Sequence, residues 1–272
     1  MLVHLIADYG SGDLAFAEVH QRLAQLIPDV QVVPVAVEPF DTLAAGFCVA
    51  QLALNAGPRG RVVMHNVAPR RDEHGPREDN AGEPFMALRA PNDVLVVGPN
   101  AGFSLAFVAA HINSAARLPV PDAGSQFRSR DFLPEAVADL VATRDRGDLP
   151  GTPVDLADVP PAPENVIAYI DGYGNIKTTW TRPPAGLGER VTVRIGDATA
   201  TAIVTDGTFA VAEGELAFAP GSSGWDTGDG VQVRFFELLL RGASAAERFG
   251  APRTGTPIKV TGAGHAADTA SA

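Results

Sequence analysis

The chain opens with LVHLIADYGSGD (residues 2–13), and this stretch decides the fold class. Residues 2–7 form a continuous apolar run, which predicts a buried strand. Residues 8–13 combine glycines with an aspartate placed to cap a helix. Beyond them, apolar residues recur at helical spacing: Phe16, Val19, Leu23, Leu26 and Ile27. The chain therefore starts with a strand, a loop and a helix.

The same alternation continues to about residue 146. We expect further strands at residues 30–37, 62–64 and 94–97, and further helices at residues 42–54, 103–112 and 134–143. Strands that alternate with helices predict an α/β domain over residues 1–146, with three α/β/α layers and a mainly parallel sheet. Ligands bind such sheets at the carboxyl ends of the strands, so the loops after the strands are the place to look for a site.

The second half of the chain has a different pattern. Residues 147–165 are rich in proline and glycine, which predicts an extended linker. Strand-like runs separated by turn residues follow at 166–170, 176–179, 191–195, 199–205, 216–219 and 231–239. They predict a smaller C-terminal β-barrel or sandwich domain over residues 166–252. Residues 253–272 are rich in Gly, Thr and Ala and are expected to form a frayed tail.

Composition narrows the classes of function. A length of 272 residues allows two domains, and a net charge of -11 argues against nucleic acid or an anionic membrane as partner. The single cysteine, Cys48, excludes an internal disulfide and lies in an apolar helical run, so we expect a buried thiol. No segment approaches the roughly 20 apolar residues that span a bilayer, and the N-terminal run lacks a basic flank. We expect a cytoplasmic protein.

Two carboxylates, Asp8 and Asp13, lie in the glycine-containing loop after the first strand. In a purely structural interpretation, Asp13 caps the next helix and Asp8 closes a turn. In a functional interpretation, one carboxylate accepts hydrogen bonds from a ribose diol or pairs with a cation of the ligand. The sequence leaves both interpretations open.

A second loop, after the strand at residues 62–64, contains His65, Asn66, Arg70 and Arg71. His65 and His74 lack the spacing of metal ligands, so we expect no metal site. A solvated, charged loop explains most of residues 70–79.

A third candidate segment is GSQFRSRD (residues 124–131), directly before an apolar helix. Cations at a helix N-terminus are unfavourable unless they are paired or used. We expect Asp131 to cap the helix with Arg130 as its partner, which leaves Arg128 and Ser129 as functional candidates. Taken alone, DGYGN (residues 171–175) predicts a turn, and RGASAAERF (residues 241–249) predicts a helix start.

In this order, Asp8-Tyr9-Gly10 with Asp13, QFRSRD, DGYGN and RGASAA resemble the S-adenosylmethionine hydroxide adenosyltransferase family, which includes the nucleophilic fluorinases and chlorinases. The resemblance covers patches between about residues 2 and 250. It implies S-adenosylmethionine (SAM) as substrate and no cofactor. It further implies a homotrimer, with the site between the first domain of one subunit and the second domain of its neighbour.

The resemblance also implies roles for single residues. Asp8 matches the position that binds the ribose hydroxyls, and Asp13 and Asp171 match carboxylates that hold the methionine ammonium. The other matching ligand positions are Phe40 as an aromatic wall, Tyr173, Asn175, the Ala243 backbone and Phe209 around the adenine, and Ser222 at the methionine. Phe127 and Arg241 lie within the matching segments, and Asn66 lies in the loop after the strand at residues 62–64; these three residues complete the expected ligand-binding set.

The sequence departs from the family in several places. Hydrolytic members carry Asp-Pro-Gly-Val-Gly and Phe-His-Gly-Arg-Asp, whereas this chain has HNVAP at residues 65–69 and Arg128-Ser129 in place of His-Gly. Ser129 coincides with the serine that holds halide in the halogenases, but their tyrosine and their threonine-rich loop are absent. Ser223 replaces the arginine that the halogenases place there.

Chemistry at such a site requires a partly desolvated nucleophile in line with the sulfonium leaving group. We expect His65 to deprotonate water, and Arg70, Arg71 and Arg128 to stabilise hydroxide, with Ser129 beside them. The expected reaction gives adenosine and methionine. Because several arginines would weaken the binding of a sulfonium cation, two alternatives stay open. One is an enzyme acting on another adenosine derivative, and the other is a non-catalytic adenosine-binding protein.

Overall fold

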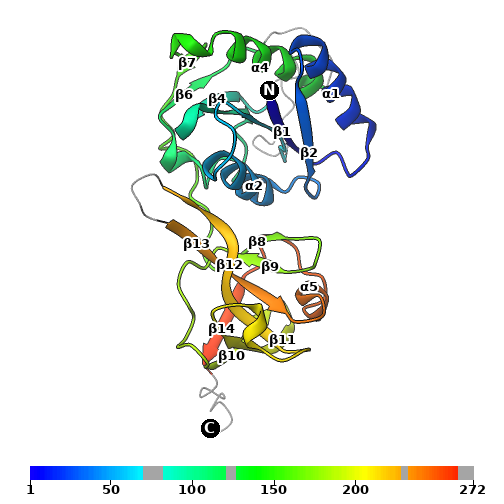
Figure 1. Cartoon of the computed structure of the whole chain (residues 1–272), viewed down its shortest axis with the longest axis vertical. Helices are drawn as coiled ribbons and strands as arrows, with labels where there is room; N and C mark the ends of the chain where they lie inside the picture. Colours follow the sequence, from blue (N-terminus) through cyan, green and yellow to red (C-terminus); the bar gives the residue numbers. More distant parts are fainter. Residues whose placement is uncertain (70–81, 121–126, 228–231, 263–272) are drawn as a thin grey trace. The chain divides into compact units, whose positions relative to one another are not determined.

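The computed structural model describes residues 1–69, 82–120, 127–227 and 232–262. The chain divides into two compact units, Met1–Pro161 and Ala162–Ala272 (Figure 1). Both are rich in β-strands, and the first adds covering helices, which confirms the α/β class. Among the described residues, no helix has the length and apolarity needed to cross a membrane.

The first unit begins with the predicted alternation of strands and helices. β1 (Leu2–Ala7), α1 (Leu14–Leu26), β2 (Gln31–Ala36), α2 (Thr42–Leu54) and β3 (Val62–Asn66) follow one another. Asp13 caps α1, since its Oδ1 accepts the Ala15 amide at 2.8 Å, and Asp41 caps α2 through the Ala44 amide at 2.9 Å. The structural role expected for Asp13 is therefore confirmed.

The sheet of the first unit is parallel only on one side. Its order is β2-β1-β3-β5-β4-β6-β7, completed by β4 (Phe85–Ala90), β5 (Val94–Pro99), β6 (Ser114–Arg117) and β7 (Thr152–Pro153). The pairs β1–β2, β1–β3 and β3–β5 are parallel, whereas β4–β5, β4–β6 and β6–β7 are antiparallel. The prediction of a mainly parallel sheet is therefore wrong for the side of the sheet formed by β4, β6 and β7. A tight turn with Asn92 and Asp93 at positive φ joins β4 to β5, and so short a connection forces an antiparallel pair.

The helix expected at residues 103–112 does not form. The chain instead makes successive turns, with a 3-10 helix only at Ala109–His111. The buried hydroxyl of Ser104 donates to the Pro99 carbonyl at 3.0 Å and accepts the Ala101 amide at 3.3 Å. Such side-chain bonds to the backbone compete with regular helix formation.

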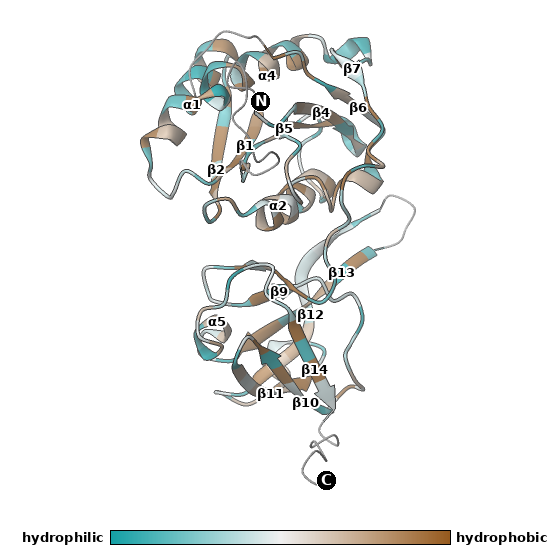
Figure 2. Cartoon of the chain, turned by 180° about the vertical axis from the view of Figure 1, so that it is seen from behind, coloured by the Kyte–Doolittle hydropathy of each residue, from teal (hydrophilic) through white to brown (hydrophobic). Residues whose placement is uncertain are grey.

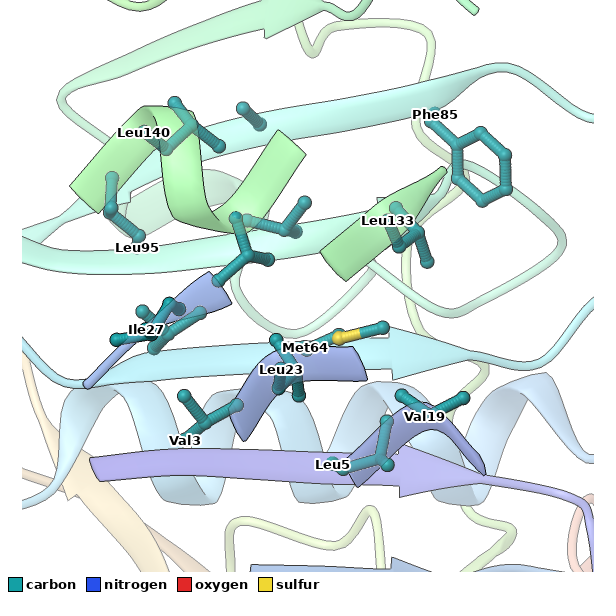
Figure 3. Packing of buried hydrophobic residues seen from close by; sticks show 14 of the residues in the cluster. Val3, Leu5, Val19, Leu23, Ile27, Met64, Phe85, Leu95, Leu133 and Leu140 are labelled. Carbon is teal, nitrogen blue, oxygen red and sulfur yellow. The ribbon is translucent and has the colours of Figure 1, made fainter. Parts of the chain in front are cut away.

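Helices cover both faces of the first sheet. Figure 1 shows α1 and α4 (Leu133–Ala142) on one face and α2 on the other. The face under α1 and α4 is a continuous apolar core (Figure 3), which includes Val3, Leu5, Leu23, Met64, Leu133 and Leu140. Side chains alternate along a strand, so Met64 faces this core while His65 faces α2. Cys48 on α2 is buried, as expected.

The second unit is a curled sheet. Its strands are β8 (Ile167–Ile170), β9 (Ile176–Thr178), β10 (Arg190–Ile195), β11 (Ala198–Val204), β12 (Leu216–Asp226), β13 (Gln232–Leu240) and β14 (Ile258–Gly262). The order is β14-β10-β11-β12-β13-β9-β8, and a bridge between Val166 and Pro257 joins the two edges. The sheet thus closes as a barrel around its own apolar core, with a short helix, α5 (Ala245–Arg248), beside it. Figure 2 shows hydrophobic colouring along the strands of both units.

The frayed tail expected from residue 253 is wrong for its first part. Strand β14 pairs antiparallel with β10, and Ile258 is buried in the barrel core. The described residues after 253 therefore belong to the barrel, and residues 263–272 lie outside the described part of the chain.

Candidate functional site

The carboxyl ends of β1 and β2 are tied together beside Asp8. The Oδ2 atom of Asp8 accepts the backbone amide of Phe40 at 2.9 Å, which links the end of β1 to the loop before α2. Phe40 has φ +63°, and its side chain is 54% exposed. A non-glycine residue in this left-handed conformation is unusual, and it holds an aromatic ring at the surface next to a carboxylate. The structure thus brings together Asp8 and Phe40, two of the expected ligand-binding residues.

Tyr9 connects β1 to the segment before α4. Its phenol hydroxyl donates to Ser129 Oγ at 2.7 Å, and its ring makes edge contacts with Phe16 and Phe127 at centroid distances of 5.1 Å and 5.6 Å. Burial raises the pKa of Tyr9 to about 12, against the opposing effect of the Ser129 hydrogen bond. The charge of Asp8 raises this pKa further, and a hydrogen bond from the Asn66 side chain lowers it. Tyr9 is therefore a neutral phenol at neutral pH.

The segment expected to carry function around Ser129 is a short helix, α3 (Arg128–Asp131). Arg130 pairs with Asp131 at 2.8 Å and with Glu18 of α1 at 3.4 Å, and its guanidinium lies 5.0 Å from the Phe127 ring centroid. The predicted Arg130–Asp131 pair is confirmed. The predicted cap is wrong, because Asp131 ends α3 and neither α3 nor α4 has a side-chain cap.

Arg128 and Ser129 occupy different environments on α3. The Arg128 guanidinium lies 5.0 Å from the centroid of the Phe85 ring, and a Cβ atom on Gly82 would overlap it. Ser129 is buried and bonded to Tyr9. The two functional candidates of this segment are thus held in place, one by an aromatic ring and one by a hydrogen bond.

His65 is not part of this cluster. It is fully buried on the α2 face of the sheet, whereas Asn66, the next residue, reaches Tyr9 on the opposite face. In the described structure neither ring nitrogen of His65 has a hydrogen-bond partner, and burial lowers its pKa to about 4. Because His65 is fully buried on the face of the sheet opposite to Asn66 and Tyr9, its imidazole is not placed to deprotonate water beside Ser129. The prediction of His65 as the base is therefore corrected.

The other basic candidates of that loop, Arg70 and Arg71, lie outside the described residues. Among the residues that are described, no group of His, Cys, Asp and Glu side chains is arranged to hold a metal ion.

In the second unit, Asp171 organises the DGYGN loop. Its Oδ1 accepts the amides of Tyr173 and Asn175, both at 3.0 Å, and its Oδ2 accepts the Asn175 side-chain amide at 3.1 Å. The loop lies against the RGASAA segment (residues 241–246, called the RGAS segment below), because the Gly174 carbonyl accepts the Ala246 amide at 2.9 Å. A Cβ atom on Gly174, which has φ +77°, would overlap Ser244. The structure thus places Tyr173 and Asn175 next to the segment that contains Ala243.

Two aromatic side chains project from this part of the barrel. Tyr173 is 84% exposed and Phe209 is 87% exposed. The Arg241 guanidinium lies 5.8 Å from the Phe209 ring centroid and donates to the Val211 carbonyl at 2.7 Å, which fixes Phe209 to the RGAS segment. Large exposed aromatic rings beside backbone donors and acceptors suit stacking on a nucleobase.

A buried ion pair in the barrel was not predicted from the sequence. Lys177 Nζ lies 3.0 Å from Glu237 Oε1 and 3.6 Å from Asp171 Oδ2. Glu237 Oε1 also accepts the backbone amide of Ser223 at 3.2 Å and its hydroxyl at 2.6 Å. Ser222, the expected methionine contact, is exposed directly beside this network. The signal was a lone glutamate inside the apolar run FFELLL (residues 235–240).

These features define a class of two-unit protein: an α/β unit with polar residues gathered near the carboxyl ends of β1 and β3, and a β-barrel with exposed aromatics suited to a nucleoside. The model of the SAM hydroxide adenosyltransferase N-terminal domain matches residues 3–149, which is more than half of the chain. The chain therefore belongs to the SAM hydroxide adenosyltransferase family. Membership supports an enzyme that uses SAM.

Solved structures share the fold along nearly the whole chain. An uncharacterized conserved protein from Thermotoga maritima matches with a TM-score of 0.72 and 19% identity, over 95% of this chain and 100% of that one. A conserved hypothetical protein from Thermus thermophilus matches with a TM-score of 0.67 and 23% identity, over 95% of this chain and 99% of that one. No curated protein matches the chain.

Proposed function

We propose that the protein hydrolyses SAM. The oxygen of water forms a bond to C5′ of the ribose while the bond from C5′ to the sulfonium sulfur breaks. The sulfur leaves with the bonding electrons as the neutral thioether of methionine, and the attacking water loses one proton to solvent. The products are adenosine and methionine.

One observation carries this proposal: consecutive residues after β1 hold two hydrogen-bonded groups. Asp8 accepts the Phe40 amide, and Tyr9 bonds to Ser129 and to Asn66 at the end of β3. Asp8 matches the position that binds the ribose hydroxyls in the family, and a carboxylate accepts hydrogen bonds from such a diol. Ser129 orients the attacking water, and the neighbouring Arg128 lowers the free energy of the developing hydroxide. These groups use the ends of parallel strands, where α/β sheets bind ligands.

The second unit supplies the recognition of the base in this proposal. Tyr173 and Phe209 stack on the adenine, while Asn175 and the Ala243 backbone bind its polar edge. Following the family resemblance, we propose a homotrimer in which the second unit of one subunit completes the site on the first unit of its neighbour.

A mixing experiment tests this arrangement. Asp8→Ala damages only the first unit, and Tyr173→Ala only the second. When the two variants are co-expressed and assayed at a low SAM concentration, where each alone is impaired, a site shared between subunits regains activity, because some sites then combine two intact halves. A site built from one chain would stay impaired in every mixture. Light scattering of the wild type measures the number of subunits.

A second candidate function is an enzyme that acts on another adenosine derivative. The carboxylates expected to hold the methionine ammonium are already engaged, Asp13 as a helix cap and Asp171 by its own loop and Lys177. Ser223 is bonded to Glu237 and offers no cation to a methionine carboxylate. These contacts favour a ligand without an amino-acid end.

The deciding experiment incubates the purified protein with SAM, with and without chloride, and follows adenosine, 5′-chloroadenosine and methionine by liquid chromatography. We expect equal amounts of adenosine and methionine, independent of chloride, and a loss of turnover in Arg128→Ala but not in the exposed control Arg182→Ala. Formation of 5′-chloroadenosine would assign the protein to halogenation. No product from SAM, together with calorimetric binding of adenosine, would support the second candidate.

A further inference from the structure

The proposed function assigns no chemical role to Tyr9, although its side chain bonds to both Ser129 and Asn66. Tyr9 is partly buried, its ring contacts Phe16 and Phe127, and its hydroxyl is hydrogen-bonded to Ser129. We infer that Tyr9 is a positioning residue that holds the Ser129 hydroxyl in the orientation needed to bind the attacking water. This inference rests on the proposed hydrolysis of SAM and adds a residue to it.

The first argument is connectivity. Tyr9 follows β1, Asn66 ends β3, and Ser129 lies on α3, so one phenol joins segments that are far apart in the sequence. The Tyr9–Ser129 distance of 2.7 Å is typical of a good O–H···O hydrogen bond. Ser129 is buried and Tyr9 is partly buried, and a hydrogen bond shielded from water fixes geometry more strongly than one at the surface.

The second argument is the direction of the hydrogen bonds. Tyr9 is protonated at neutral pH, and its hydroxyl donates a hydrogen bond to Ser129 Oγ. The Asn66 side chain forms a hydrogen bond to the same phenol. With its oxygen accepting from Tyr9, the Ser129 hydroxyl presents its own hydrogen to an oxygen of the ligand or of water.

The third argument is that the aromatic contacts do not need the phenol oxygen. The Tyr9 ring meets Phe16 at 67° and Phe127 at 89°, both edge-to-face arrangements that phenylalanine would reproduce. The hydroxyl is therefore separable from the packing. Without it, Ser129 would keep its place on α3 but lose the group that orients its hydroxyl.

The experiment is a double-mutant cycle with Tyr9→Phe and Ser129→Ala, in which kcat and KM for SAM and the Kd for adenosine are measured. We expect Tyr9→Phe to lower kcat about tenfold, as the loss of one oriented hydrogen bond does, and to leave KM and the adenosine Kd within about twofold. In the Ser129→Ala background, Tyr9→Phe should have no further effect on kcat. The control Tyr169→Phe, which removes a phenol oxygen in the second unit, should retain wild-type kcat.

The outcomes separate this inference from the function on which it rests. A wild type that releases no adenosine from SAM overturns both. An active wild type with an equally active Tyr9→Phe variant overturns the inference alone. Additive losses in the double mutant, or a loss that resides in KM and the adenosine Kd, also overturn it, because Tyr9 would then act by supporting the fold or the ligand rather than through Ser129.

Discussion

The buried imidazole of His65 makes the stability of the protein depend on pH in a calculable way. In the unfolded chain its pKa has the ordinary value of 6.5, whereas burial lowers it to about 4 in the folded protein. Above pH 6.5 the ring is neutral in both states, so it adds no pH dependence there. As the pH falls below 6.5, the imidazole binds a proton in the unfolded state but not in the folded state. The free energy of unfolding therefore decreases until the pH reaches the pKa of the folded state.

The size of the effect follows from the difference between these pKa values. The full loss is about 3 kcal/mol near pH 4, and about 2 kcal/mol is already lost near pH 5. Replacement by leucine removes the titration. It also removes two ring nitrogens that lack hydrogen-bond partners in the described structure, so His65→Leu should be at least as stable as the wild type near pH 8.

Urea unfolding of wild type and His65→Leu, followed by circular dichroism at about pH 8 and about pH 5, measures this difference. The variant should lose about 2 kcal/mol less than the wild type between the two conditions. His20→Leu, at an exposed position on α1, is the matched control and should follow the wild type. If wild type and His65→Leu lose the same stability, the imidazole is not buried in its neutral form and the argument fails.

Further substitutions test the other networks. Lys177→Met should lower the free energy of unfolding in urea by about 3–5 kcal/mol, because it leaves Glu237 buried without its cation. Adding Glu237→Leu should restore part of that loss. An unchanged urea midpoint in Lys177→Met would refute the role of the pair. Arg61→Met should lower the free energy of unfolding by about 2–4 kcal/mol, because the Arg61 guanidinium donates to four backbone carbonyls in the last turn of α2 and the loop after it. The control Arg59→Met, at an exposed neighbouring position, should leave the free energy of unfolding unchanged in the same urea experiment. Tyr173→Ala should weaken adenosine binding about tenfold by calorimetry, and equal affinity in both proteins would remove the stacking role.

The first half of the fold was predictable because its signals are local. The apolar run at residues 2–7 and the spacing of Phe16, Val19 and Leu23 each determine one element without knowledge of the rest. The antiparallel side of the sheet was not predictable in the same way. Strands β4 and β6 are short, and their direction depends on the tight turn at residues 91–93. Strand β14 becomes ordered only by pairing with β10, more than sixty residues earlier in the chain.

The candidate site shows the same division between local and long-range information. The sequence identified Asp8, Asn66 and Ser129 as candidates. In the structure Tyr9, the residue after Asp8, bonds to both Asn66 and Ser129. The sequence could not show which of His65 and Asn66 faces the site. Neighbouring residues of a strand point to opposite faces of the sheet, and the sequence did not show which face carries the site. Only the packing of Met64 into the core under α1 decides this.

In the proposed function the two units have different roles, which separate measurements can resolve. The first unit would hold the groups that act on the reacting bond, and hydrogen bonds inside the unit fix these groups. The barrel offers exposed aromatic rings, whose loops are fixed by Asp171 and Arg241. Changes at Ser129 or Tyr9 should therefore lower kcat with little change in adenosine affinity, whereas changes at the barrel rings should raise the adenosine Kd first. Because each unit has its own core, both classes of variant should stay folded, and the kinetic contrast between them can be attributed to the site rather than to stability.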